Sequence, residues 1–257
     1  MKKGLPSIRE LLRATFGLLG RNASFYLGYS AWLLLPITIT LIAYNTLPEE
    51  AATIIDILAS VFGYGVITVF VSALFIRATP ILLEENEKPE NLTQNAWALV
   101  IPFLLTSILV GLIVTGGIIA LVVPGIIFSI WFVFATSITV LEEKKPIESI
   151  KISKELVKGR FWPIAWRYFG VALLFILVYM TLAAAIVLIF FFIGAPMESA
   201  QISTLEQFSV FASEMTYNPS IELVTTLRLL DIIFIPIGLI FSTIFYLEAK
   251  KTQEVDS

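Results

Sequence analysis

The sequence predicts an all-α polytopic membrane protein, a single transmembrane domain over residues 1–257 with six helices that cross the bilayer. Hydrophobic residues make up 58% of the chain and charged residues only 14%, and the mean hydropathy is +0.90. A soluble domain has about 25% charged residues. Apolar runs near the ~20 residues that a helix needs to cross the hydrocarbon layer recur along the chain. Helices satisfy their backbone hydrogen bonds within each run, which gives the fold class.

The predicted spans follow directly from these apolar runs. A Pro-Gly pair, residues 124 and 125, separates the third run from the fourth and predicts a tight turn between them. Polar connectors of amphipathic character precede the first, third and fifth runs, so we expect three helical hairpins in a degenerate threefold repeat. The spans are predicted at 25–44, 54–75, 98–123, 126–141, 163–193 and 223–247.

The first connector, residues 7–20, is predicted to form an amphipathic helix that lies at a membrane interface. Ser7 and Glu10 have the spacing of a capping box, the reciprocal pair of hydrogen bonds that starts a helix. Its apolar residues fall on one side of a helical wheel and its arginines on the other. A helix packed on the rest of the protein is the alternative. Ser203 and Glu206 form another such box and predict an interfacial helix in the loop 194–222.

The distribution of basic residues predicts the topology. Of the 17 lysines and arginines, all except Arg167 and Arg228 lie before the first span, after the last, or in the loops 76–97 and 142–162. The other three loops contain none. Because cytoplasmic loops carry the excess of lysine and arginine, both termini are predicted to be cytoplasmic.

The loop between the fourth and fifth spans contains a second predicted interfacial helix, residues 146–159. Its two serines are four residues apart among apolar neighbours, so they form a small face suited to close packing. Its lysines gather on the opposite side, toward lipid headgroups. A glycine is expected to end the helix in the left-handed conformation, and a tryptophan to anchor the next span. These candidate residues are Ser149, Ser153, Lys154, Lys158, Gly159 and Trp162.

Three ionisable residues in apolar spans form a candidate polar cluster: Asp56, Arg228 and Asp231. Such residues are costly in lipid and mark functional sites by default. Arg228 and Asp231 are three residues apart, a spacing that lets them pair on a helix. Asp56 starts from the same membrane face and can join them. A shielded ion pair and a site for a solute or proton both remain open.

The composition excludes several kinds of chemistry. The chain has no cysteine and no histidine, so we expect neither thiolate or imidazole metal sites nor catalytic groups of those types. Nucleotide-binding loops are also absent from the sequence. We therefore predict no catalytic residues, no metal, no cofactor and no nucleic-acid partner. The expected partner is the lipid bilayer, with anionic headgroups at the cytoplasmic face.

One stretch of about forty residues carries a resemblance to a known family. It contains "PGI" at Pro124 to Ile126, Trp131 in the fourth span, an acid at Glu142 or Glu143, and the pattern SxxLxKGxxW from Ser153 to Trp162. This stretch resembles the six-span membrane domain of some bacterial glycerophosphodiester phosphodiesterases and of related stand-alone prokaryotic membrane proteins. Ser149 departs from the alanine expected there.

The resemblance implies an integral membrane module of a prokaryotic plasma membrane, in membrane organisation or lipid-related physiology. It implies no phosphodiesterase activity, because the catalytic barrel, with its histidines, is not expected in this chain. The first prediction is therefore a non-enzymatic membrane protein. The alternative is a transporter of a small or amphiphilic solute that uses Asp56, Arg228 and Asp231. A lipid enzyme within the membrane ranks third, because no acid-base pair can be named.

Overall fold

The computed structural model describes residues 4–84, 92–194 and 221–256, and every regular element in these ranges is a helix. Six helical stretches in this part of the chain are long and apolar enough to cross a membrane, which confirms the predicted class. The interfacial helix predicted around Ser203 lies outside the described residues. The six stretches are Ala23–Thr46, Glu49–Leu83, Leu92–Ala120, Val122–Leu141, Phe161–Phe191 and Leu223–Glu254.

Three of the six stretches are composite. The first joins α2 (Ala23–Ser30), a 3-10 turn η1 (Ala31–Leu33) and α3 (Leu34–Thr46). The second joins α4 (Glu49–Leu58), a π-helical segment η2 (Ala59–Tyr64) and α5 (Gly65–Leu83). The fourth joins α7 (Val122–Trp131) and α8 (Ala135–Leu141). The other helices are α1 (Ile8–Arg21), α6 (Leu92–Ala120), α9 (Pro146–Val157), α10 (Phe161–Gly194) and α12 (Ile221–Asp256).

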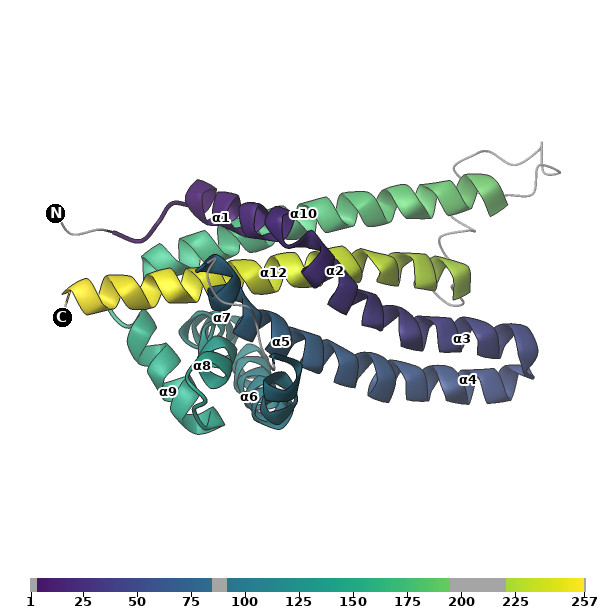
Figure 1. The fold of residues 1–257 in the computed structure, drawn as a ribbon, viewed down its shortest axis with the longest axis horizontal. Coiled ribbons are helices and arrows are strands. Elements are labelled where there is room, and N and C mark those ends of the chain that lie inside the picture. The colour runs from purple at the N-terminus through teal and green to yellow at the C-terminus, as the bar shows by residue number, and fades with distance from the viewer. Residues whose placement is uncertain (1–3, 85–91, 195–220, 257) are drawn as a thin grey trace.

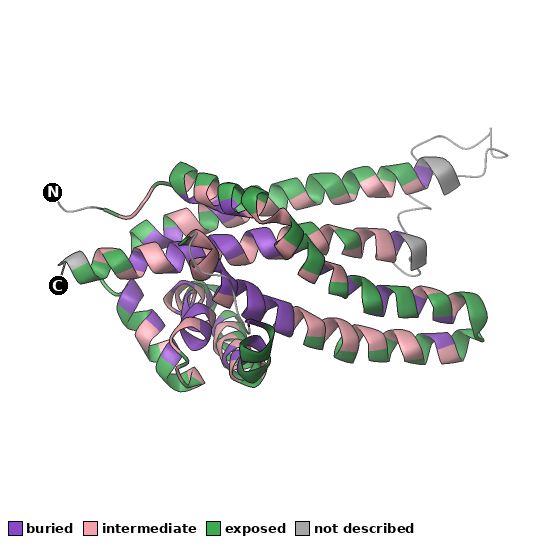
Figure 2. Ribbon diagram, viewed as in Figure 1, coloured by how far each residue is buried: buried purple, intermediate pink, exposed green. Residues whose placement is uncertain are grey.

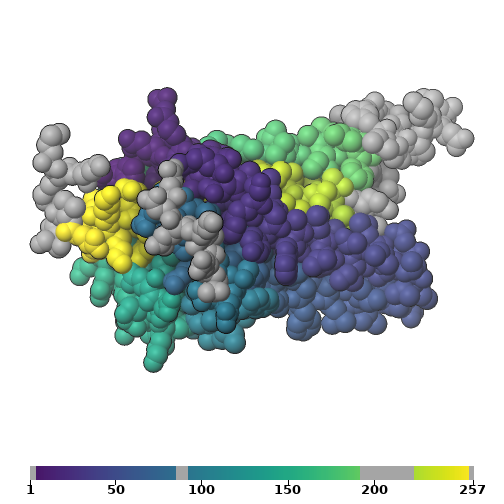
Figure 3. Space-filling model, viewed as in Figure 1, coloured from purple at the N-terminus to yellow at the C-terminus, as the bar shows by residue number. Residues whose placement is uncertain are grey.

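Different helices lie at the two ends of the molecule. Figure 1 shows that α3, α4, α10 and α12 run along the long axis, with the turn between α3 and α4 at one end. Helices α1 and α9 and the C-terminal turns of α12 gather at the other end, which we call the basic end. The space-filling view shows α1 and the last turns of α12 side by side there (Figure 3). Helix α1 packs extensively on α12, whereas α9 contacts mainly α8 and α6 and touches α12 only slightly.

Helices α6 and α7 run across the direction of the other long helices. Figure 1 shows them nearly end-on, while α3, α10 and α12 lie in the plane of the view. The N-terminal half of α6 packs on α5, where the ring of Trp97 stacks on that of Phe70 at 4.5 Å. Near its C-terminal end α6 packs closely on α7, where a Cβ at Gly117 would lie 2.9 Å from Cα of Gly125. The threefold hairpin repeat therefore stays a prediction, because the second pair differs in direction from the first.

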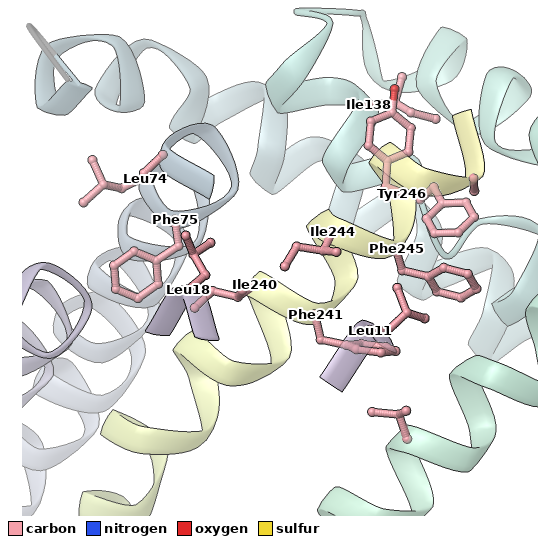
Figure 4. Close-up of a cluster of buried hydrophobic side chains, with 14 of the residues drawn as sticks. Leu11, Leu18, Leu74, Phe75, Ile138, Ile240, Phe241, Ile244, Phe245 and Tyr246 are labelled. Atoms are coloured by element: carbon pink, nitrogen blue, oxygen red, sulfur yellow. The ribbon is translucent and has the colours of Figure 1, made fainter. Parts of the chain in front are cut away.

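The buried core lies toward the basic end. Figure 2 shows the buried residues concentrated there, whereas the arms formed by α3, α4 and α10 are largely exposed. Helix α12 crosses the core and supplies aromatic and branched side chains that meet α1, α5 and α8 (Figure 4). The apolar side chains that these arms expose are suited to contact with the hydrocarbon interior of a bilayer. The core residues labelled in the close-up are Leu11, Leu18, Leu74, Phe75, Ile138, Ile240, Phe241, Ile244, Phe245 and Tyr246.

The turn predicted at Pro124 and Gly125 is wrong. Helix α6 ends at Ala120, Leu121 is extended, and Pro124 and Gly125 lie in the first turns of α7. Proline fits there because the first N–H groups of a helix have no partner inside it. Gly125 instead allows close packing, since a Cβ at this position would lie 2.3 Å from Cγ1 of Ile118. Pro124 thus lies in the first turn of α7, and Gly125 lets α7 pack closely on α6 after the turn.

Helix α1 has the predicted capping box. The Ser7 N–H donates to Oε2 of Glu10 at 2.7 Å, and the Glu10 N–H donates to the Ser7 hydroxyl at 3.3 Å. Leu11 and Leu18 are buried against the protein. Arg167 of α10 further holds the preceding segment by donating to two backbone carbonyls there. The alternative prediction, packing on the protein, therefore describes this face, and the membrane-interface position stays a prediction.

Candidate polar cluster and the seat of α9

The candidate polar cluster lies between the second and sixth membrane-spanning stretches. Asp56 is on α4, and Arg228 and Asp231 are on α12. Among the members that the sequence prediction missed are Ser60 and Tyr64, which belong to the π-helical segment η2. They follow Asp56 at intervals of four residues, and this spacing was the available indication. Short π-helical segments often occur at functional sites.

Helix α3 packs closely on the π-helical segment. A Cβ at Gly63 would lie 3.1 Å from Cβ of Pro36, so the glycine allows this approach. Thr40, one turn beyond Pro36 on α3, donates its hydroxyl hydrogen to Oδ1 of Asp56 at 3.1 Å. The first and second stretches are thereby tied together at the level of the cluster.

Arg228 pairs with the second stretch. Its NH1 atom is 4.0 Å from Oδ1 of Asp56, and its NH2 group donates to the Ser60 hydroxyl at 3.0 Å. The Ser60 hydroxyl in turn donates to Asp56 at 3.3 Å. The side chains of Arg228 and Asp56 keep 27% and 28% of their surface exposed. The pair is therefore partly shielded rather than deeply buried within the protein.

Asp231 has a different partner from the one that the sequence spacing predicts. Its carboxylate accepts a hydrogen bond from the Tyr64 hydroxyl and also interacts with Tyr179 of α10. Among the described ion pairs, none joins Arg228 to Asp231. The predicted pairing within α12 is thus replaced by contacts to the second stretch. Arg228 contacts Asp56 and Ser60 there, and Asp231 contacts Tyr64. The Arg228 guanidinium lies over the Tyr64 ring at 5.9 Å and connects the two halves of the cluster.

Helix α9 is seated on the fourth stretch by Ser153. Its hydroxyl donates to the Trp131 carbonyl at 2.8 Å and accepts the Phe134 N–H at 3.2 Å. These two backbone groups lie at the break between α7 and α8, where helical hydrogen bonding is interrupted. Ser149 is also fully buried, and its hydroxyl is 3.4 Å from the Lys144 carbonyl oxygen. The sequence prediction identified the serine face but missed the break that Ser153 bridges.

The other candidate residues of this connector lie around the contact that Ser153 makes with the fourth stretch. Gly159 has φ 80°, the left-handed conformation that lets the chain turn out of α9 into α10. The Lys154 amine lies over the Trp131 ring, 4.5 Å from its centroid. Lys158 is exposed, and Trp162 keeps 78% of its surface exposed at the start of α10. Serines therefore face the bundle while Lys158 and Trp162 face outward.

A second polar junction lies at the basic end. Glu142, just after α8, accepts hydrogen bonds from the Tyr246 hydroxyl and from Nζ of Lys250, the latter at 2.7 Å. Burial favours a raised pKa for Glu142, but these hydrogen bonds and the lysine charges outweigh it and hold the pKa below the ordinary 4.5. Arg77 pairs with Glu143 at 3.1 Å. The junction joins the second, fourth and sixth stretches, and the sequence prediction missed its basic partners.

Within the described ranges, no group of three or more Asp, Glu, His or Cys side chains is placed to hold a metal ion. No family model, no curated protein and no solved structure matches this chain. The candidate sites therefore rest on their own geometry. They comprise a polar cluster between membrane-spanning stretches and a basic end fixed by buried serines and ion pairs.

Proposed function

We propose that this chain is a non-enzymatic, multi-pass protein of a prokaryotic plasma membrane that organises anionic lipid at the cytoplasmic face. The observation that carries the proposal is the seating of α9: its serines bind the bundle, which leaves Lys145, Lys151 and Lys158 exposed. In this orientation the basic end faces the cytoplasm, as the distribution of lysine and arginine predicts. Basic residues near the inner leaflet attract anionic headgroups.

A non-catalytic role fits the way in which the polar side chains are used. Asp56 and Arg228 are engaged with each other and with Ser60, and Asp231 is engaged with Tyr64. At the basic end, Glu142 is engaged with Lys250. These contacts connect helices to one another and make the polar residues structural elements of the fold.

The proposal is tested by the lipids that accompany the protein. The chain is extracted with its surrounding lipid into polymer-bounded discs, and the phosphatidylglycerol content of the discs is compared with that of the whole membrane. We expect enrichment of anionic lipid, and a loss of enrichment when Lys145, Lys151 and Lys158 are all changed to glutamine. Discs with the composition of the bulk membrane contradict the proposal.

A transporter is the second candidate function, and the polar cluster is the observation that favours it. A carboxylate that meets tyrosine hydroxyls between apolar helices is the kind of group that carries protons or cations in membranes. Purified protein in vesicles with an internal pH dye tests this role. A transporter that uses Asp231 dissipates a pH gradient faster than the Asp231→Asn variant does. Equal rates for the two proteins and for empty vesicles reject it.

A further inference from the structure

A hollow of about 560 Å³ lies where the middle of α6 meets the first turn of α9. Its apolar wall is formed by Leu105, Ile108 and Leu109 of α6, and Lys145 and Lys151 stand at its rim. The volume is within the range of small-molecule sites. The middle of α6 thus places an apolar surface beside two lysine amines.

The charge balance at the rim is positive. Glu148 also borders the hollow, but its carboxylate is paired with Lys144 at 3.0 Å. Lys145 immediately precedes the first residue of α9, Pro146, so the positive end of the helix dipole adds to the lysine charges. The hollow therefore combines a positive rim with an apolar wall.

We propose that this hollow binds one anionic phospholipid, with its phosphate between Lys145 and Lys151 and an acyl chain along the leucine and isoleucine wall of α6. The site rests on the proposed function and deepens it, since it replaces general attraction to headgroups by one defined position. Basic pockets between helices at the cytoplasmic face of membrane proteins bind anionic headgroups in this way.

The chemistry of the hollow selects a phospholipid over other anions. A soluble phosphate would use the lysines but would gain nothing from the apolar wall. An acidic peptide would need polar groups for its backbone, and the wall offers hydrocarbon. A phospholipid matches both parts, because its phosphate and its acyl chain are joined in one molecule.

Native mass spectrometry of the detergent-purified protein tests the site. Phosphatidylglycerol and phosphatidylcholine of equal chain length are added in equal amounts, and the binding constant of the first lipid is measured for each. The wild type is expected to bind one phosphatidylglycerol in preference. Lys151→Gln should weaken this binding about fivefold, the factor equivalent to ~1 kcal/mol per basic residue. Lys251→Gln, an exposed lysine of α12 outside the hollow, should leave it unchanged.

A second pair of variants tests the acyl position. Ile108→Trp fills the hollow and should remove the preferred lipid, whereas Leu104→Trp adds the same bulk to an exposed position of α6 outside it. Competition by inorganic phosphate alone would make the site a plain anion site and overturn the proposal. A change of oligomeric mass with Ile108→Trp, in place of a change in bound lipid, would make this face a protein interface and also overturn it.

The outcomes separate this site from the proposed function on which it rests. If all lysine variants, Lys251→Gln included, lower the preference equally, anionic lipid is organised by the basic end as a whole and the single site is rejected. If the wild type shows no preference for phosphatidylglycerol, both the site and the proposed function fail.

Discussion

Replacing Ser153 by alanine removes the hydroxyl group that bridges the two halves of the broken fourth stretch. In the wild type this hydroxyl satisfies the Trp131 carbonyl and the Phe134 N–H, and the serine is fully buried. The variant therefore leaves the buried Phe134 N–H and the partly buried Trp131 carbonyl without this partner.

The magnitude follows from these two hydrogen bonds. A buried polar group that loses its partner costs about 1–3 kcal/mol. The bond to Trp131 is short at 2.8 Å and the bond from Phe134 is longer at 3.2 Å, so we expect a loss of about 2–4 kcal/mol in total. For a chain of this size that loss corresponds to a fall of about 4–16 °C in Tm.

Thermal unfolding in detergent, followed by circular dichroism, measures this effect, and Ser149→Ala is the matched control. Ser149 is equally buried on the same face of α9, but its hydroxyl makes only a marginal contact at 3.4 Å. Its loss should cost about 0–1 kcal/mol. A Tm for Ser153→Ala within a degree of the Tm for Ser149→Ala would refute the assignment of the bridge.

Three further predictions concern the polar contacts and the hairpin. In a double-mutant cycle on thermal stability, Arg228→Ala and Asp56→Ala should couple by about 0.5–1 kcal/mol, the range of partly exposed pairs, whereas Arg228→Ala and Asp231→Ala should couple less strongly, because they meet only through Tyr64; the opposite ranking would restore the pairing within α12. Because the folded protein holds the pKa of Glu142 below 4.5, this residue stabilises the fold above that pH, and its contribution is lost as the pH falls through the lowered value. Glu142→Gln should thus lower Tm at pH 7 and lose this difference in acid; a difference that is constant with pH would count against the ionised contact. Gly125→Ala should lower Tm because its Cβ would lie 2.3 Å from Ile118, while Gly116→Ala, which meets nothing within 4 Å, should not; equal effects would contradict the close crossing of α6 and α7.

The sequence was sufficient for features that depend on local patterns. Apolar runs of the length of a bilayer predicted the six stretches, and helical periodicity predicted that Ser149 and Ser153 face the bundle. Gly159 was predicted to end α9 because glycine takes a left-handed conformation at little cost. Each of these inferences uses residues that are neighbours along the chain.

The features that the sequence did not predict depend on distant contacts. Residues 132–134 interrupt the fourth stretch without a proline or glycine, and the hydroxyl that stabilises the break comes from α9. Arg228 lies three residues from Asp231 along α12, yet Tyr64 of another stretch binds Asp231. The α6–α7 pair runs across the other long helices and contacts elements that are distant in the sequence, α5 and α9 among them.

The central claim is that the basic end faces the cytoplasm, and cysteine labelling in intact cells tests it most directly. The chain contains no cysteine, so single cysteines can be introduced at Lys145 in the basic end and at Glu50 in α4, at the opposite end, without background. A membrane-impermeant maleimide is applied before and after the cells are opened. We predict that the cysteine at position 50 reacts in intact cells, while the cysteine at position 145 reacts only after opening. The reverse pattern would contradict the orientation and, with it, the proposed contact with lipid at the cytoplasmic face.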